Sequence, residues 1–128
     1  MIADTSFVID LIRNNPAAVR KINELSGEEQ KITSPTVFEL YTGVSRSKWP
    51  EKEKKKVLEY LSRQTIIEMD AKSAEFAGTI DGDLIRKGER ISQVDCMIAG
   101  IALCKKETVL TKNVKDFSKI KTLSLESY

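Results

Sequence analysis

Short apolar runs alternate with amphipathic segments along the chain, and this alternation predicts its elements. Apolar runs predict strands at residues 1–3, 31–33, 65–69, 108–111 and 122–125. Apolar positions with a helical period predict helices over 6–13, from 16 to about 27, from 34 past 41, from 50 past 61, over 71–87 and over 94–103, and a helical turn at 115–120. Strands that alternate with helices predict an α/β fold, with a central, mostly parallel sheet of about five strands between helical layers.

Local signals refine several of these elements. Pro16 and Pro50 suit the first position of a helix, and Ser34 before Pro35 predicts a cap followed by a first helical residue. We expect the first helix to bury Phe7, Val8, Leu11 and Ile12. The helix that follows Pro50 should bury Val57, Leu58 and Leu61 and expose its lysine-rich face.

Length and composition restrict the class of protein. The 128 residues suit one domain that spans 1–128, and 41% hydrophobic with 31% charged residues excludes a disordered chain. A net charge of +2 neither demands nor excludes a nucleic-acid partner. No apolar segment approaches the roughly 18 residues of a membrane helix, and residues 1–4 do not resemble a signal peptide, so we expect a cytoplasmic protein without a membrane partner.

The absence of histidine excludes several kinds of catalytic site. A Ser-His-Asp triad, a Cys-His pair and a histidine-ligated zinc all require a residue that this chain lacks. Cys96 and Cys104 lie eight residues apart in a predicted helix, about 12 Å along its axis, which is too far for a disulfide. We therefore expect both thiols to be reduced core residues, and any chemistry to depend on carboxylates.

Four acidic residues are predicted to gather at one edge of the sheet. Asp4 follows the first strand, Glu39 lies one turn into the helix after the second, Asp95 lies in the first turn of the apolar helix, and Asp116 follows the fourth strand. In a parallel α/β sheet, strand ends and helix starts meet at the carboxyl edge, where ligands usually bind. Because clustered carboxylates repel one another, a hard divalent cation such as Mg²⁺ or Mn²⁺ is the natural counterion.

Helix capping is the alternative explanation for each acid. Asp4 suits a cap of the first helix, and the segments 36–39, 92–95 and 113–116 each have the form of a capping box. Taken singly, capping is the simpler explanation. Taken together, and with Glu39 and Asp95 among apolar neighbours, the four acids favour a shared site.

Four motifs in order resemble those of PIN-domain proteins, in particular VapC-type toxins of prokaryotic toxin–antitoxin pairs. They are MIADTSFVIDL at residues 1–11, VFELYTG at 37–43, ISQVDCMIAG at 91–100 and LTKNVKDF at 110–117. The resemblance covers residues 1 to about 120 and implies a PIN-like three-layer α/β/α sandwich. Two positions depart from the family's usual pattern: Gln93 stands where many relatives have an additional acid, and Ser6 where many have asparagine.

The resemblance implies a metal-dependent endoribonuclease that hydrolyses RNA phosphodiester bonds. Its catalytic quartet corresponds to Asp4, Glu39, Asp95 and Asp116, with Asp4, Asp95 and Asp116 as metal ligands and Glu39 acting on the attacking water. Ser6, Thr111 and Asn113 occupy supporting positions. Motif position suggests Arg46, Arg86, Lys112 and Lys115 as contacts to RNA phosphates. The family also implies Mg²⁺ or Mn²⁺ as cofactor, a cognate antitoxin protein and a homodimer, with Tyr41, Trp49 and Tyr60 as candidate interface residues.

Other classes of protein remain as alternatives. An aspartyl-phosphate phosphatase needs a second acid at position 6, where this chain has Ser6, and a phospho-receiver domain needs paired acids where this chain has Ala3 before Asp4. A PIN-like nuclease of RNA processing and a non-catalytic interaction module both stay open. Metal-dependent turnover separates an enzyme from an interaction module.

Overall fold

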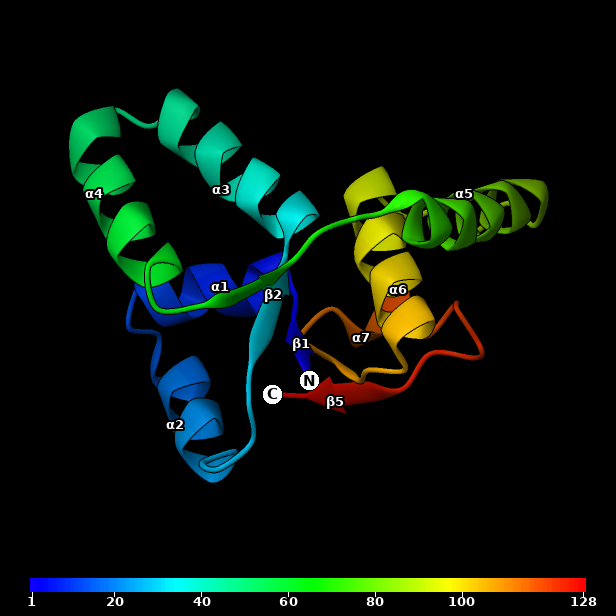
Figure 1. Cartoon of the computed structure of the whole chain (residues 1–128), viewed down its shortest axis with the longest axis horizontal. Helices are drawn as coiled ribbons and strands as arrows, with labels where there is room; N and C mark the ends of the chain where they lie inside the picture. Colours follow the sequence, from blue (N-terminus) through cyan, green and yellow to red (C-terminus); the bar gives the residue numbers. More distant parts are fainter.

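The computed structural model describes residues 1–128 and contains one sheet of five strands, all parallel (Figure 1). The strands follow the order β3-β2-β1-β4-β5, so the first strand of the chain is the central one. Ile2 aligns with Lys31 on one side and with Val109 on the other. The strands are β1 (Ile2–Ala3), β2 (Lys31–Thr33), β3 (Thr65–Ile67), β4 (Val109–Thr111) and β5 (Leu125–Ser127).

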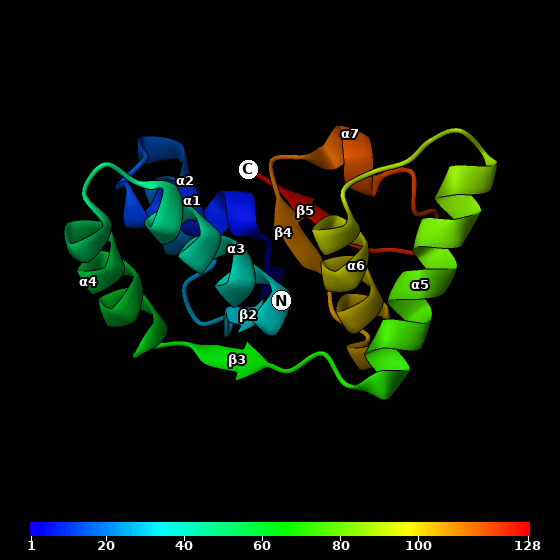
Figure 2. The same cartoon turned by 90° about the horizontal axis from the view of Figure 1, so that it is seen from above.

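Seven helices cover this sheet, and Figure 2 shows α1–α4 grouped on one side with α5 and α6 on the other. They are α1 (Thr5–Ile12), α2 (Pro16–Glu24), α3 (Ser34–Arg46), α4 (Pro50–Leu61), α5 (Ala71–Arg86), α6 (Gln93–Lys105) and α7 (Val114–Phe117). The predicted α/β class and the parallel sheet between helical layers are confirmed.

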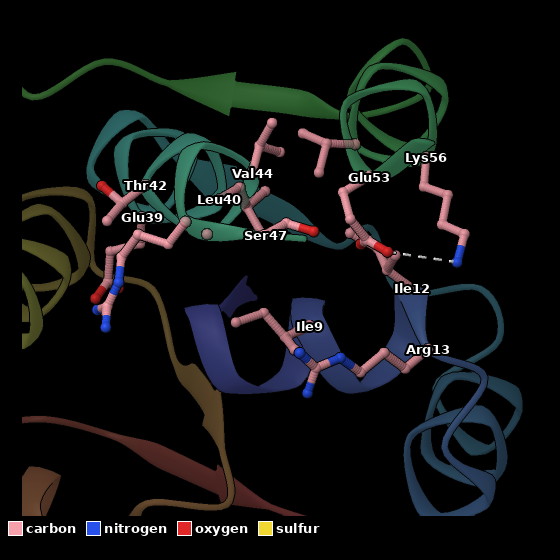
Figure 3. Close-up of a pocket in the computed structure, with 13 residues that line it drawn as sticks. Ile9, Ile12, Arg13, Glu39, Leu40, Thr42, Val44, Ser47, Glu53 and Lys56 are labelled. Carbon is pink, nitrogen blue, oxygen red and sulfur yellow. Dashed lines mark ion pairs between the residues drawn. The ribbon is translucent and has the colours of Figure 1, made fainter. Parts of the chain in front are cut away.

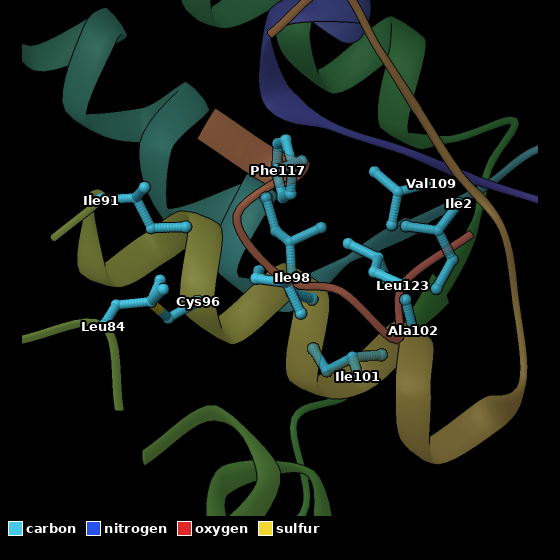
Figure 4. Packing of buried hydrophobic residues seen from close by; sticks show 12 residues of the cluster. Ile2, Leu84, Ile91, Cys96, Ile98, Ile101, Ala102, Val109, Phe117 and Leu123 are labelled. Atoms are coloured by element: carbon cyan, nitrogen blue, oxygen red, sulfur yellow. The ribbon is translucent and has the colours of Figure 1, made fainter. Parts of the chain in front are cut away.

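The core consists of two apolar clusters, one on each face of the sheet. Successive strand residues point to opposite faces. Ile2 packs in the cluster that contains residues of α5, α6 and α7, whereas Ala3 packs in the cluster that contains residues of α1, α2, α3 and α4. Val109 and Leu110 divide between the clusters in the same way. Figure 4 shows the first cluster, in which Ile98 and Phe117 lie near Val109.

The chain leaves the carboxyl ends of the neighbouring strands β1 and β4 toward opposite faces of the sheet. β1 leads into α1 on one face, and β4 leads into α7 on the other. Neighbouring parallel strands whose connections leave to opposite faces form the topological switch point at which α/β sheets bind ligands. The residues that follow β1 and β4 therefore lie where chemistry is expected.

The close approach of α5 and α6 depends on Gly100. A Cβ at this position would lie 2.6 Å from the Ala77 backbone nitrogen and 2.8 Å from the Ser73 carbonyl oxygen, both in α5. Such distances are below van der Waals contact, so only glycine lets the two backbones come this close. This packing holds the start of α6, with Asp95, against the rest of the domain.

Several local expectations need correction. Thr33, not Ser34, caps α3 by accepting from the Thr36 backbone N–H, because Ser34 is already helical and its hydroxyl accepts from the Met69 N–H. Strand β5 covers Leu125–Ser127 instead of 122–125, because its pairing with β4 extends to residue 127. Leu58 is 49% exposed, since α4 turns only Val57 fully into the core.

The cysteines and the lengths of the helices bear on two further expectations. Cys96 and Cys104 are both free thiols; Cys96 is buried, whereas Cys104 is only half-buried. None of the helices combines the length and the apolar composition that a membrane span requires.

Candidate active site

Asp4 lies at the carboxyl end of β1, directly after that strand, and is 2% exposed. Its Oδ1 accepts from the Phe7 backbone N–H at 2.9 Å, which caps α1, and Ser6 Oγ lies 2.8 and 2.9 Å from the two carboxylate oxygens. Thr111 Oγ1 donates to Oδ2 at 2.5 Å from the end of β4. Burial raises the pKa of Asp4, although these hydrogen bonds, the one from Thr111 first, oppose the shift. The carboxylate is thus held in one orientation.

A second chain of hydrogen bonds links Thr111 to Asp116. The Asn113 backbone N–H donates to Thr111 Oγ1 at 2.8 Å, and Asn113 Nδ2 donates to Asp116 Oδ2 at 3.1 Å. Lys119 Nζ lies 3.6 Å from Asp116 Oδ1. The residues predicted to support the site therefore do contact two of the four acids: Ser6 and Thr111 bind Asp4, and Asn113 binds Asp116.

The other two acids reach the same place from α3 and α6. Burial and then the negative charges of Asp4, Glu39 and Asp116 raise the pKa of Asp95 to about 6. Since the charges of these three carboxylates act on Asp95, the structure brings all four predicted acids together in one electrostatic environment. Asp95 and Glu39 are half-buried, so neither carboxylate is freely solvated.

Capping and clustering coexist at these acids. Asp4 is both the cap of α1 and a member of the cluster, and Ser92 Oγ caps α6 by accepting from the Asp95 backbone N–H at 3.1 Å. At α7 the expected cap is absent, because the Asn113 side chain makes no capping hydrogen bond and instead donates to Asp116. A capping role therefore does not argue against a role in a site.

The donor set consists of hard oxygen ligands, which suit Mg²⁺ or Mn²⁺ and not a soft metal. As the side chains lie, no three acidic, cysteine or histidine side chains converge closely enough to hold an ion. Two oxygens of Asp4 are engaged by hydroxyl groups, and Asp95 and Glu39 have rotatable, partly exposed carboxylates. The raised pKa of Asp95 indicates uncompensated negative charge, which a bound cation relieves.

The four basic residues suggested by motif position have different surroundings. Lys112 forms an ion pair with Asp10, with 2.7 Å between Nζ and Oδ2, and Arg86 pairs with Asp83 of its own helix. Arg46 and Lys115 are exposed, and Arg46 lines a groove outside the sheet. Only Lys112 contributes a charge that acts on Asp4.

That groove, of about 630 Å³, runs between α1, α3 and α4 (Figure 3). Its apolar lining comes from the three helices, and charged side chains stand around it, including the ion pair of Glu53 and Lys56. Glu39 lines it as well, so the groove extends to one member of the acidic cluster. Its apolar residues are Ile9, Ile12, Leu40, Val44 and Val57.

Sequence reasoning missed the carboxylate and the phenol that hold Lys112. Asp10 is 9% exposed, and the Tyr128 hydroxyl donates to its Oδ2 at 2.8 Å. These residues are 118 positions apart, so no local pattern joins them. A buried acid on the inner face of an amphipathic helix was the one available signal.

The fold is a parallel α/β domain, and its four acids gather near the topological switch point. A comparison with protein families identifies the class of protein to which this domain belongs. Residues 1–123 match the model of the PIN domain. The chain therefore belongs to the PIN-domain family, as its motifs had indicated.

Individual relatives are VapC proteins. The chain is 32% identical over 125 residues to the tRNA(fMet)-specific endonuclease VapC of Shigella flexneri, covering 98% of this chain and 95% of the relative. It is 33% identical over 127 residues to ribonuclease VapC2 of Rickettsia felis, with the same coverage. A crystal structure of VapBC2 from Rickettsia felis bound to a promoter DNA fragment contains a chain with a TM-score of 0.89 and 30% identity, covering 99% of this chain and 97% of that one. The protein is thus a toxin ribonuclease of the VapC kind, a hydrolase.

Proposed function

We propose that the protein is a Mg²⁺- or Mn²⁺-dependent endoribonuclease whose active site is the quartet Asp4, Glu39, Asp95 and Asp116. The observation that carries the proposal is the arrangement of the acids at the carboxyl ends of β1 and β4, where Ser6 and Thr111 bind Asp4 and Asn113 binds Asp116. The charges of Asp4, Glu39 and Asp116 act on Asp95 in the same place. Four carboxylates kept together without a counterion destabilise the protein, and a divalent cation is the ligand that compensates them.

Each residue has a distinct task in this proposal. Asp4, Asp95 and Asp116 hold the metal, and Glu39 orients the attacking water and accepts its proton. Ser6 and Thr111 fix the Asp4 carboxylate, and Asn113 fixes that of Asp116. The bound metal lowers the pKa of water and stabilises the negative charge of the departing oxygen. No histidine is present to act as the base, so Glu39 takes this role.

We further propose structured RNA as the substrate and an antitoxin protein as the partner. One relative is named a tRNA(fMet)-specific endonuclease, which makes initiator tRNA the first substrate to test. Structural relatives were solved as VapBC, and one of them is described as a member of the VapBC family of toxin–antitoxin systems, which supports an antitoxin partner. An enzyme with this substrate acts in the cytoplasm. Arg46, Arg86, Lys112 and Lys115 remain proposed phosphate contacts.

A homodimer is also part of the proposal. Of the three aromatic residues suggested for an interface, Trp49 is 70% exposed, whereas Tyr41 and Tyr60 are half-buried against the core. Phe38, which sequence reasoning did not single out, is 65% exposed beside Glu39. Exposed aromatic side chains are typical of interfaces.

The test is cleavage of initiator tRNA by the purified protein in Mg²⁺, in Mn²⁺ and in EDTA. We expect cleavage that needs the metal and is lost in Asp4→Asn and in Asp95→Asn, each of which keeps the side-chain shape. Glu75→Gln is the matched control, because Glu75 is an exposed acid of α5 that pairs only with Lys72. Cleavage that persists in both aspartate variants would reject the quartet as the active site.

A further inference from the structure

A lysine, a buried carboxylate and a phenol form a cluster beside the acidic quartet. Lys112 Nζ lies 2.7 Å from Asp10 Oδ2, and the Tyr128 hydroxyl donates to the same oxygen at 2.8 Å. The three residues come from α1, from the turn after β4 and from the residue after β5. The Tyr128 ring also packs edge-on against buried Phe7, with 4.8 Å between ring centroids. Tertiary contacts therefore fix the acceptor to which Lys112 is bound.

The ionised carboxylate of Asp10 keeps the Lys112 ammonium in place. Burial tends to raise the pKa of Asp10, but the hydrogen bonds from Lys112 and Tyr128 lower it below its ordinary value. Asp10 is therefore ionised at neutral pH. Tyr128 is held as a neutral donor, since burial and its hydrogen bond to Asp10 raise its pKa.

The lysine ammonium is close enough for its charge to act on Asp4, and its side chain remains accessible. Lys112 follows Thr111, the residue whose hydroxyl binds Asp4, and its positive charge acts on Asp4. Its side chain is 52% exposed, whereas that of Asp10 is only 12% exposed. An ammonium group has three N–H donors, and Asp10 takes one of them. The others are free to bind an anion beside the quartet.

An ion pair that only stabilises the fold does not need one exposed and one buried partner, whereas Lys112 is exposed and Asp10 is buried. A free lysine loses rotamer entropy when it binds a phosphate. Here, Asp10 and Tyr128 have already fixed the side chain before any ligand arrives, and such preorganisation strengthens binding. The ion pair of Lys31 provides a comparison within this protein. Lys31 Nζ lies 2.6 Å from Glu107 Oε1 at the opposite edge of the sheet, and both side chains are mostly buried.

We propose that Asp10 and Tyr128 are positioning residues that hold the Lys112 ammonium beside the acidic quartet, where it binds a phosphate of the RNA substrate. The inference rests on the proposed nuclease function and adds a phosphate contact and the two residues that place it. Lys112 binds the substrate, and Asp10 and Tyr128 act only through Lys112.

The first test measures RNA binding without cleavage. A fluorescein-labelled RNA hairpin is titrated in Mg²⁺ into Glu39→Gln protein, and its affinity is followed by anisotropy at several salt concentrations. We expect Lys112→Gln to weaken binding about tenfold, the effect of losing roughly one charge-assisted contact. The slope of log affinity against log salt should fall in magnitude by about 0.7–0.9, as expected for one phosphate contact. Lys112→Arg should restore most of the affinity.

The second test separates positioning from structural support. Tyr128→Phe keeps the ring against Phe7 and removes only the hydroxyl, and we expect it to weaken binding about two- to threefold. In protein that already carries Lys112→Gln, the same change should have no effect. Asp10→Asn should also weaken binding, although removal of a negative charge by itself favours RNA binding. Lys31→Gln is the matched control and should leave the affinity and the salt slope unchanged.

The outcomes distinguish this inference from the function on which it rests. Unchanged binding in Lys112→Gln, an equal effect of Tyr128→Phe with and without Lys112, or tighter binding in Asp10→Asn overturns the positioning role. If the wild-type protein cleaves RNA and Asp95→Asn does not, the proposed function stands even when the positioning role falls. If the wild-type protein neither binds nor cleaves RNA, the proposed function itself falls.

Discussion

Asp95 is the residue on which the charges of the other three acids converge. In the metal-free protein its pKa is raised to about 6, so the folded state binds a proton that the unfolded state, with an ordinary value near 3.8, has already lost. Between about pH 4 and pH 6 the folded protein therefore holds more protons than the unfolded one. The free energy of unfolding falls as the pH rises through this window, and the loss is complete above it.

Asp95→Asn should therefore stabilise the metal-free protein, although it inactivates the proposed enzyme. In EDTA at pH 8 we expect the Tm to rise by about 5 °C, because the neutral amide removes the repulsion. At pH 4.5 the difference should be much smaller, since Asp95 is then protonated in most of the folded wild-type protein and only the ionisation of the unfolded chain still contributes. Thermal unfolding at the two pH values checks this, with Glu75→Gln as the exposed control. An equal gain at both pH values would contradict the electrostatic cause.

The Thr111 hydroxyl joins the two hydrogen-bonded parts of the site, one around Asp4 and the other around Asn113 and Asp116. Its Oγ1 donates to Asp4 and accepts from the Asn113 N–H, and the side chain is fully buried. Thr111→Val keeps the volume but leaves the Asp4 oxygen and the Asn113 N–H each without a partner, which should lower the free energy of unfolding by about 1–3 kcal/mol. Denaturant unfolding measures the loss. Thr79→Val, which removes an exposed hydroxyl of α5, should change stability by no more than about 0.5 kcal/mol.

At this scale, sequence reasoning identified the residues that sit in local motifs. Asp4 directly follows a strand, Asp95 and Asp116 lie in the first turns of their helices, and Ser6 and Asn113 lie within three residues of the acid that they bind. Thr111 was identified through its own motif, although the Asp4 that it binds is 107 positions away. Asp10 and Tyr128 lie in no such motif, and their contact depends on how α1 packs beside β5. Such long-range contacts leave no periodic signal in the sequence.

Among the elements, α5 and α6 are the pair whose packing is most sensitive to a single methyl group. Gly100→Ala would place a Cβ 2.6 Å from the Ala77 nitrogen, and the helices would have to separate. We expect the free energy of unfolding to fall by about 1–3 kcal/mol, which outweighs the gain of roughly 1 kcal/mol in helix propensity. Because α6 carries Asp95, cleavage activity should fall as well.

Gly78→Ala and Gly82→Ala provide the matched comparison in α5. A Cβ at either position meets no atom within 4 Å, so the substitution changes only the helix propensity of the residue. Both should raise the free energy of unfolding by about 0.5–1 kcal/mol. Urea unfolding of the three variants together gives the result. Destabilisation by all three would show that helix packing is not the cause at Gly100.

The elements themselves were largely predictable, because most carry a strong pattern. The apolar run at β4, the helical period of α5 and the almost continuous apolar stretch of α6 mark elements whose predicted positions lie within a few residues of the observed ones. The position of β5 was not predictable from its pattern. It is an edge strand with half-exposed residues, and pairing with β4, not hydrophobicity, sets its limits.

At the scale of the whole molecule, the metal should stabilise the fold that assembles its site. A ligand that binds only the folded state raises its stability in proportion to the logarithm of its concentration. We expect Mg²⁺ at millimolar concentration to raise the Tm of the wild-type protein, and this increase to be lost in Asp4→Asn. Scanning calorimetry with and without EDTA measures it. The same rise in Asp4→Asn and in wild type would place the cation elsewhere.

The central place of β1 has a consequence for how the protein is made. Its neighbour β4 lies more than 100 residues further along the chain, and the four acids are contributed by positions 4, 39, 95 and 116. A growing polypeptide on the ribosome therefore cannot assemble the acidic quartet until nearly all of its codons have been translated. A fragment that stops before Asp116 would lack part of the proposed active site, so it should not have the proposed activity.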